Sequence, residues 1–268
     1  MLLALDVGNT NVTIGLYLED ELVATWRLAS SREETADEWG LQFLQLLKRE
    51  GFRPQDVTEA AMVSVVPPLN ARLVDACRRY LKVPLMELTS THRSLPKIYY
   101  DNVAALGTDR LVNAVAAWER YGRSQGVPVI AVDFGTATKL ECVSAAGEYL
   151  GGCIAPGIGI STEALARYAA RLPRIELAPP RQVIGKNIVA SLQAGIIFGF
   201  AGQADGLVTR LTQEIAPSGP APMVVATGGL AHLVAAQSKT IRLVDPHLTL
   251  EGVRLMYWKN REPEDTWS

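Results

Sequence analysis

Apolar and polar residues follow each other along this chain with two spacings, one typical of strands and one typical of helices. Short apolar runs bounded by turn residues predict buried strands, and apolar residues repeated every three or four positions predict helices. The predicted elements of the first half are strands at residues 2–6, 12–18 and 22–28, a helix between Thr35 and Gly51, a strand at 60–66, a helix at 69–81, a strand at 84–88 and a helix at 108–121. This alternation predicts an α/β fold.

The second half of the chain repeats the order of elements with which the first half begins. Turn residues at 122–126 end the helical pattern, and a new apolar run then leads to Asp133, which stands 127 positions after Asp6. The predicted elements are strands at 127–132, 139–144 and 149–155, helices at 161–172 and 187–215, strands at 223–226 and 241–244, and a polar, frayed tail at 260–268. The duplication predicts two similar α/β domains, residues 1–122 and 127–260, with a ligand in the cleft between them.

The repeated unit ends its first strand on an aspartate, with a glycine two residues later. Residues 6–8 form the first copy and residues 133–136 the second. Glycine lets the backbone turn tightly, so that successive N–H groups converge on phosphate oxygens, and the carboxylate positions a metal ion beside them. A third glycine turn, at residues 228–229, gives room for adenosine. Because neither a G-x-x-x-x-G-K-[ST] loop nor a strand-linked G-x-G-x-x-G is present, P-loop and Rossmann enzymes are disfavoured.

Composition and charge exclude several classes of protein. A content of 48% hydrophobic and 20% charged residues fits a globular protein with a substantial core. The net charge of −2, without extended Lys/Arg clusters, disfavours nucleic acid as a partner. The three cysteines lack C-x-x-C spacing, which fits a reducing compartment without a disulfide framework or a zinc site.

No basic segment precedes the first strand, and the apolar stretch at 194–201 is far shorter than the roughly 20 residues of a membrane span. We therefore expect a cytoplasmic protein with no membrane partner.

The long helix predicted at residues 187–215 carries four glycines on one face, at positions 195, 199, 202 and 206. Glycine costs a helix about 1 kcal/mol per position relative to alanine, so the stripe indicates close approach of another backbone. Helix packing within the chain is the more common reason for such a stripe. The alternative is a subunit interface.

Seven stretches of the chain resemble those of type III pantothenate kinases, members of the acetate kinase, sugar kinase, Hsp70 and actin superfamily. The stretches are residues 6–11, 63–67, 107–111, 133–138, 149–152 with 155–157, 185–187 and 226–229. They follow the family's order over nearly the whole chain. The resemblance implies an α/β fold of two similar actin-like (ribonuclease H-like) domains with a nucleotide cleft between them. It also implies ATP-dependent phosphorylation of pantothenate, the first step of coenzyme A biosynthesis.

The resemblance further implies a role for each matching residue. Asp109 takes the position of the catalytic base, and Asp133 that of the ligand of a monovalent cation, K⁺ or NH₄⁺, while Mg²⁺ accompanies ATP. The implied ATP contacts are Asp6, Val7, Gly8, Asn9, Thr10, Asn11, Val12, Thr13 and Thr136. The implied pantothenate contacts are Tyr100, Gly107, Thr108, Asp109, Arg110 and Ile188. Because the family's substrate site lies partly at a subunit interface, a homodimer is implied as well.

The residue types suit these roles. An acceptor hydroxyl needs a carboxylate that orients it and takes its proton as the bond to phosphorus forms, and Asp109 stands at the start of a predicted helix, where it can point into the cleft. The planar fork of Arg110 suits the carboxylate of pantothenate, but it suits Asp109 or a phosphate equally well.

A few positions depart from the family pattern. Ile188 replaces a threonine that contacts substrate, which puts one hydrogen bond of about 1 kcal/mol in doubt. Lys139 and Glu141 replace a threonine and an aspartate, and the lysine either helps at the phosphates or faces solvent. Two other functions stay open, a catalytically weak or inactive nucleotide-binding regulator and a kinase of the same fold for another alcohol. The unaltered set of Tyr100 and residues 107–110 argues against another substrate.

Overall fold

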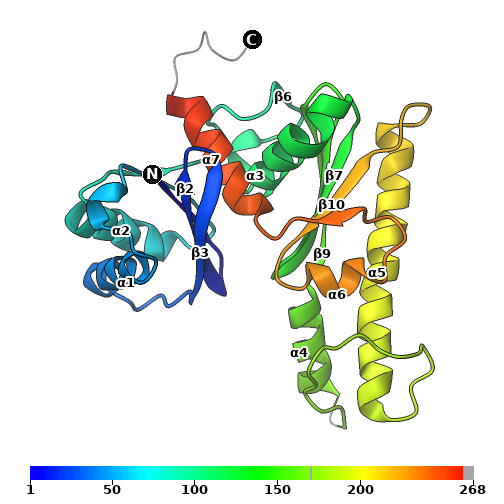
Figure 1. The fold of residues 1–268 in the computed structure, drawn as a ribbon. Coiled ribbons are helices and arrows are strands. Elements are labelled where there is room, and N and C mark those ends of the chain that lie inside the picture. Colours follow the sequence, from blue (N-terminus) through cyan, green and yellow to red (C-terminus); the bar gives the residue numbers. More distant parts are fainter. Residues whose placement is uncertain (170, 262–268) are drawn as a thin grey trace. The chain divides into compact units, whose positions relative to one another are not determined.

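The computed structural model describes residues 1–169 and 171–261, and the chain folds into two compact units (Figure 1). Unit 1 comprises Met1–Ser94, Asn102–Val115 and Thr249–Ser268, and unit 2 comprises Leu95–Asp101 and Ala116–Leu248. The sequence-based division at residues 122–127 cuts the chain only once. In the structure, by contrast, a short segment of the first half belongs to unit 2 and the last helix belongs to unit 1. The tail expected to fray lies almost entirely outside the described residues.

Unit 1 is built on a five-stranded mixed sheet. Its strands are β1 (Leu2–Val7), β2 (Asn11–Leu18), β3 (Glu21–Ala29), β4 (Glu59–Ser64) and β5 (Leu85–Glu87). Its helices are α1 (Ala36–Arg49), α2 (Pro67–Ala76), α3 (Thr108–Ala117) and α7 (Leu248–Arg261). The sheet order is β3-β2-β1-β4-β5, with β1 antiparallel to β2 and parallel to β4. The five strands predicted in the first half are confirmed, each end to within two residues.

Helices α1 and α2 cover one face of this sheet. A capping box stands at the start of α1, where Thr35 Oγ1 accepts a hydrogen bond from Glu38 N and Glu38 Oε2 accepts one from Thr35 N, at 3.3 and 2.7 Å. Such a cap stabilises a helix by about 1 kcal/mol because it satisfies N–H groups that have no partner inside the helix. The core on this face includes Leu3, Leu5, Ile14, Trp39, Phe43 and Leu73.

Helix α7 packs on the opposite face of the same sheet. A Cβ atom added to Gly15 of β2 would lie 2.9 Å from Leu250 Cδ1 of α7, and one added to Gly252 would lie 2.1 Å from the carbonyl oxygen of Val112 in α3. The two glycines therefore let α7 approach both the sheet and α3 closely. This packing places the start of α3, with residues 107–110, in unit 1.

Unit 2 repeats the arrangement of unit 1 and adds one strand. Its strands are β6 (Lys97–Ile98), β7 (Val129–Phe134), β8 (Ala137–Val143), β9 (Glu148–Pro156), β10 (Met223–Thr227) and β11 (Leu243–Val244). The order is β11-β10-β7-β8-β9-β6. As in unit 1, two antiparallel strands follow the first strand on one side, and two parallel strands lie on the other. The predicted duplicated α/β fold is thus confirmed.

The helices of unit 2 differ from the prediction at several points. They are α4 (Ile158–Tyr168), α5 (Ile188–Ile215) and the short α6 (Ala231–Ala235). Helix α4 begins three residues earlier than the predicted start at 161, because Gly157 is extended and acts as its N-cap while Gly159 is helical. Strand β6, which is not among the predicted strands, has only two residues and pairs with β9.

The glycine stripe of α5 has no packing partner among the described residues. A Cβ atom added to Gly195, Gly199 or Gly202 would meet nothing within 4 Å, and one added to Gly206 would meet only a guanidinium nitrogen of Arg210, at 3.8 Å. The reading of the stripe as close helix packing inside the chain is therefore wrong. The other face of α5 is buried, with Ile197, Ala201, Ala204 and Val208 directed into unit 2.

Candidate active site

The turn between β1 and β2 carries the first of the predicted nucleotide-binding stretches, in unit 1. Gly8 N donates to the carbonyl oxygen of Asn11 at 3.0 Å, which closes the turn and leaves Asn9 and Thr10 exposed. Ser30, just after β3, braces the turn from the side, since its Oγ donates to the Gly8 carbonyl and its N donates to the Thr10 carbonyl. A fixed and exposed turn of this kind can present backbone N–H groups to phosphate oxygens.

The start of α3 holds the predicted catalytic base. Asp109 lies in the first turn of the helix, and the backbone N–H groups of Arg110 and Leu111 donate to the Gly107 carbonyl at 3.1 and 3.2 Å. A Cβ atom added to Gly107 would lie only 2.6 Å from Asp109 Oδ1, so the carboxylate lies over the glycine and occupies the space of a side chain. Arg110 is buried at 7% exposure. The missing side chain of Gly107 thus leaves room for a partly exposed carboxylate at a helix start.

The second turn, between β7 and β8, is tightly enclosed in unit 2. A Cβ atom added to Gly157 would lie 2.1 Å from the Thr136 carbonyl oxygen, and one added to Gly228 would lie 2.6 Å from the backbone of Phe134. Gly228 also has a φ of +96°, which L side chains rarely adopt. Gly228 lies just after β10, so the third predicted glycine turn packs against the second. Thr136 itself is exposed.

Asp133 has a cationic side chain beside it. Lys139 Nζ lies 2.9 Å from Asp133 Oδ2. The Lys139 side chain is only 16% exposed and the Asp133 side chain only 15%. The donor set therefore does not fit a free monovalent cation on this carboxylate, since an ammonium group already lies there. Glu141, the other unassigned departure, is buried and accepts a hydrogen bond from the Tyr149 hydroxyl at 2.6 Å.

The remaining two predicted substrate contacts both belong to unit 2. Tyr100 follows β6, and its ring centroid lies 6.2 Å from that of Tyr149. Ile188 is the first residue of α5 and is 52% exposed, next to the N-cap Asn187, whose Oδ1 accepts from Ala190 N at 2.8 Å. Of the predicted site residues, unit 1 thus holds residues 6–13 and 107–110, and unit 2 holds Tyr100, Asp133, Thr136 and Ile188.

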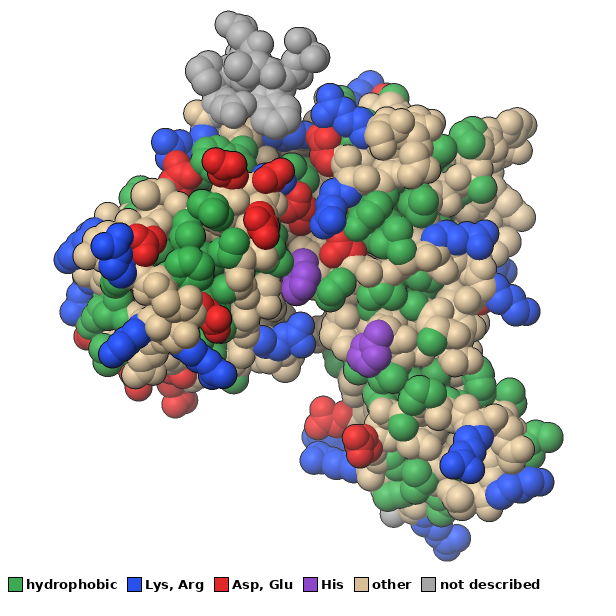
Figure 2. Space-filling model, in the orientation of Figure 1, with side chains coloured by type: hydrophobic (Ala, Val, Ile, Leu, Met, Phe, Trp, Pro, Cys, Tyr) green, Lys and Arg blue, Asp and Glu red, His purple; other side chains and the backbone are tan. Residues whose placement is uncertain are grey.

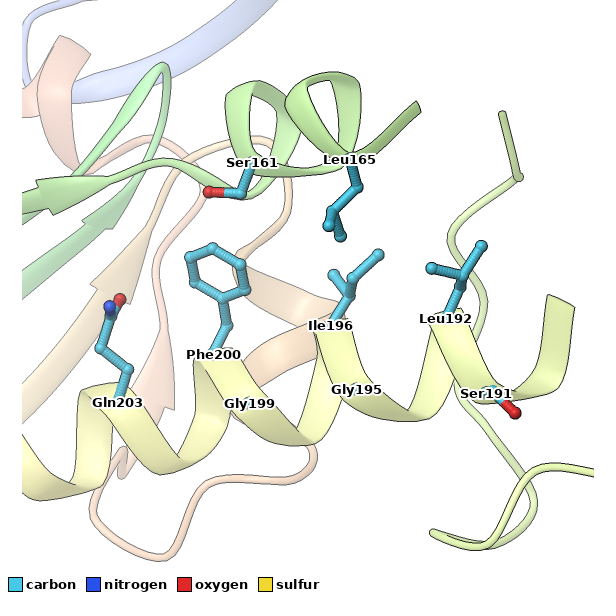
Figure 3. A pocket seen from close by; sticks show the side chains of 9 residues that line it. All are labelled: Ser161, Leu165, Ser191, Leu192, Gly195, Ile196, Gly199, Phe200 and Gln203. Carbon is cyan, nitrogen blue, oxygen red and sulfur yellow. The ribbon is translucent and has the colours of Figure 1, made fainter. Parts of the chain in front are cut away.

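A hollow between α4 and α5 lies beside the glycine stripe (Figure 3). Leu165 of α4 points toward α5, and Leu192, Ile196 and Phe200 of α5 point toward α4. The volume of the hollow is about 260 Å³. Its lining is mainly apolar, with Ser161, Ser191 and Gln203 as the polar residues, and contains no charged side chain, so it suits a hydrophobic partner better than a phosphate.

Known sequences identify the family of the chain. The profile of the type III pantothenate kinase family matches residues 2–210. A "Type III pantothenate kinase 1" of Symbiobacterium thermophilum is 68% identical over 97% of both chains. A "Type III pantothenate kinase" of Anaeromyxobacter dehalogenans is 48% identical over 97% of this chain and its own entire length. This chain belongs to the type III pantothenate kinase family.

Solved structures support the fold of this type III pantothenate kinase family member. Component A of (R)-2-hydroxyglutaryl-CoA dehydratase from Acidaminococcus fermentans matches 97% of the chain with a TM-score of 0.55 and 15% identity, and covers 99% of its own length. The polyphosphate/ATP-glucomannokinase of an Arthrobacter strain matches 96% of the chain with a TM-score of 0.51 and 11% identity, over 98% of its own length. At these identities the likeness concerns the fold alone, which is the actin-like fold expected from the sequence.

Membership in a kinase family implies ATP and a divalent metal ion. Among residues 1–169 and 171–261, no three His, Cys, Asp or Glu side chains form a group that could hold a metal ion by themselves. Mg²⁺ does not need such a cage, because it is usually bound through one or two carboxylates together with substrate phosphates and water. Asp6, at the end of β1 beside the exposed turn, offers a carboxylate of the required chemistry.

Proposed function

We propose that the chain transfers the γ-phosphoryl group of ATP to the primary hydroxyl of pantothenate and so forms 4′-phosphopantothenate, the first step of coenzyme A biosynthesis. The observation that carries the proposal is the Asp109 carboxylate held over Gly107 at the start of α3, in a chain of this family. A kinase needs a carboxylate in a fixed position near the acceptor hydroxyl. The space that Gly107 leaves for the Asp109 carboxylate supports this role.

We assign ATP to the turn of residues 6–13 and to Thr136. The exposed backbone around Asn9 and Thr10 supports phosphate binding in unit 1, and the exposed Thr136 offers a hydroxyl in unit 2. When Mg²⁺ is bound with ATP, it offsets negative charge on the phosphates, and Asp6 is the residue that would hold it. The glycines at residues 228–229 leave room at the end of β10 for the adenosine.

In the chemical step, Asp109 accepts the proton of the pantothenate hydroxyl while the oxygen of that hydroxyl bonds to the γ-phosphorus. The bond between the γ-phosphorus and the bridging oxygen breaks, and ADP leaves with that electron pair. A carboxylate in this role contributes about 10²- to 10⁴-fold to the rate. Arg110, Thr108 and Tyr100 are assigned to pantothenate binding, together with Ile188, which offers an apolar contact in place of a hydroxyl.

We further propose that the enzyme is a homodimer joined through the α4–α5 face. The open glycine stripe supports this assignment, and so do exposed apolar side chains on the same elements, among them Leu165, Tyr168, Ile188 and Val189. Figure 2 shows hydrophobic side chains at the surface over α4 and the start of α5. Ile188 lies at this face, which fits a pantothenate site completed by a second copy.

Helix α5 also has the apolar composition of a membrane-spanning helix. By length and composition alone, this helix of 28 residues could cross a membrane, with a mean hydropathy of 1.2 over its most apolar 18 residues. However, one side of α5 packs on the core of unit 2, through Ala204 and Val208 for example. We therefore assign the apolar surface to the subunit interface and place the enzyme in the cytoplasm, with neither membrane nor nucleic acid as a partner.

The proposal is tested by measuring ADP release with ATP and pantothenate, with and without KCl. We expect turnover that requires pantothenate. The variant Asp109→Asn should lower kcat by about 10³-fold while the dissociation constant of ATP, measured by calorimetry, stays the same. Asp20→Asn, in the exposed β2–β3 turn, is the matched control and should behave as the wild type. Absence of turnover by the wild-type enzyme in both buffers would refute the kinase assignment, and retained turnover by Asp109→Asn would remove that residue from the role of base.

A further inference from the structure

The β7–β8 hairpin contains a charged pair to which the proposed mechanism gives no role. Asp133 and Lys139 face each other directly in the antiparallel ladder, so their side chains project from the same face of the sheet. Their charged groups are 2.9 Å apart, and each side chain is about five-sixths enclosed. An ion pair this well enclosed is screened by solvent far less than a surface pair.

The duplicated fold supplies an internal comparison for this pair. In unit 1 the corresponding aspartate is Asp6, and the residue opposite it on β2 is Thr13. The same strand–turn–strand unit therefore forms with a threonine opposite the aspartate. Folding of the hairpin does not by itself require a lysine at this place, and Lys139 is a feature of unit 2 alone.

The pair lies at the base of the second phosphate turn. Cβ atoms added to Gly135 and Gly228 would lie 3.2 and 2.7 Å from Asp133 Oδ1, while Lys139 Nζ lies against Oδ2. One oxygen of the carboxylate thus faces the turn and the other faces the ammonium group. Thr136, assigned to ATP, is the next residue of that turn after Gly135.

We propose that the ammonium group of Lys139 supplies at Asp133 the positive charge that the family resemblance attributes to K⁺ or NH₄⁺, so that this kinase turns over without a monovalent cation. The inference rests on the proposed function. An ammonium group carries the same charge as K⁺, and its three donors suit carboxylate and phosphate oxygens. Because it is covalently attached, it is present at full occupancy without any binding equilibrium. Lys139 is a positioning residue that acts through Asp133 and the turn above it.

The test compares turnover in two buffers of equal ionic strength, one containing KCl and one containing tetramethylammonium chloride. The wild-type enzyme should have the same kcat in both, within about two-fold. Lys139→Thr installs the residue found at the matching place in unit 1, removes the ammonium group from Asp133, and should lower kcat by about 10- to 100-fold without K⁺. KCl should restore most of this loss, because the space vacated by the ammonium group then admits K⁺.

Two further variants and a second readout separate this role from a merely structural one. Lys139→Arg keeps the charge and should remain independent of K⁺, whereas Lys48→Thr on the exposed face of α1 should match the wild type in both buffers. KCl should raise the melting temperature of Lys139→Thr relative to tetramethylammonium chloride, and should not raise that of the wild type.

The outcomes distinguish this inference from the proposed function. A wild-type enzyme that turns over only with KCl overturns the inference and leaves the kinase assignment intact. An unchanged kcat of folded Lys139→Thr in both buffers also overturns it, as does a loss of activity that KCl does not restore. Absence of wild-type turnover in both buffers refutes the proposed function instead.

Discussion

The contact between Gly107 and Asp109 yields the sharpest prediction for catalysis. In Gly107→Ala the new Cβ atom would lie 2.6 Å from Asp109 Oδ1, whereas real Cβ contacts are almost never below 3.0 Å. Gly107 does not have a positive φ, so alanine fits its backbone without strain. The atom that must move is therefore the end of the Asp109 side chain, by several tenths of an ångström.

The size of the effect follows from this displacement. A misplacement of about 1 Å in a reacting group can cost about 100-fold in rate. For a shift somewhat smaller than this, we expect a 10- to 100-fold loss of kcat, which corresponds to about 1.4 to 2.7 kcal/mol in the activation free energy. Folding stability should change much less, by about 1 kcal/mol or below, because the flexible carboxylate can rotate away and only a helix-start residue is altered.

The assay is steady-state ADP release, together with urea unfolding of the same protein. Gly219→Ala is a matched control, since Gly219 lies in an exposed loop where the nearest atom to an added Cβ is 4.0 Å away. It should leave kcat and stability unchanged. If Gly107→Ala kept kcat within about two-fold of the wild type at unchanged stability, the position of the carboxylate over Gly107 would have no catalytic importance, and the reasoning from that contact would be wrong.

Two further predictions concern the other glycines. Gly228→Ala combines a φ of +96° with a Cβ position 2.6 Å from the Phe134 backbone, so it should lower the free energy of unfolding by about 2 kcal/mol or more in urea titrations; a loss below about 0.5 kcal/mol would show that the turn adapts freely. Gly199→Glu places a charged side chain in open space on α5, so light scattering should show half the wild-type molar mass with an unchanged far-UV circular dichroism spectrum. An unchanged mass of a dimeric wild type would exclude the glycine stripe as the interface.

Sequence patterns predict those elements that bury a long periodic face. Strands β1, β2 and β4 and helix α1 each contain several buried residues, β3 alternates half-buried with exposed residues along most of its length, and the Thr35 capping box marks the start of α1 locally. In contrast, β6 has two residues and α6 has five, too few for any period to show. The packing of the glycine stripe could not be predicted for a different reason, since a helix face that packs against another subunit and one that packs inside its own chain carry the same pattern of residues.

The candidate site likewise has features that can be predicted from the sequence and features that cannot. Aspartate and glycine at strand ends can be recognised from residue type and spacing, and so can residues 107–110 at a helix start. The partner of each charge, in contrast, could not be predicted, because a partner depends on the register between strands. The short turn at residues 135–136 places Lys139 directly opposite Asp133, and shifting the register by one residue would send the lysine to the other face. A hairpin register worked out from the short glycine turn is the one signal that could have revealed this pair.

The turn between β1 and β2 and the turn between β7 and β8 differ in length, and this difference bears on their proposed roles in binding ATP. In unit 1 the turn closes from Gly8 N to the Asn11 carbonyl and projects exposed residues, whereas in unit 2 it closes from Gly135 N to the Ala137 carbonyl and is one residue shorter. The longer turn offers more backbone N–H groups to a flexible polyanion. The shorter turn is packed between glycines and supported by an ion pair, so it can hold charge in a fixed position. Phosphoryl transfer needs both properties, since substrate phosphates must enter and leave while the field that acts on the transferred group stays fixed.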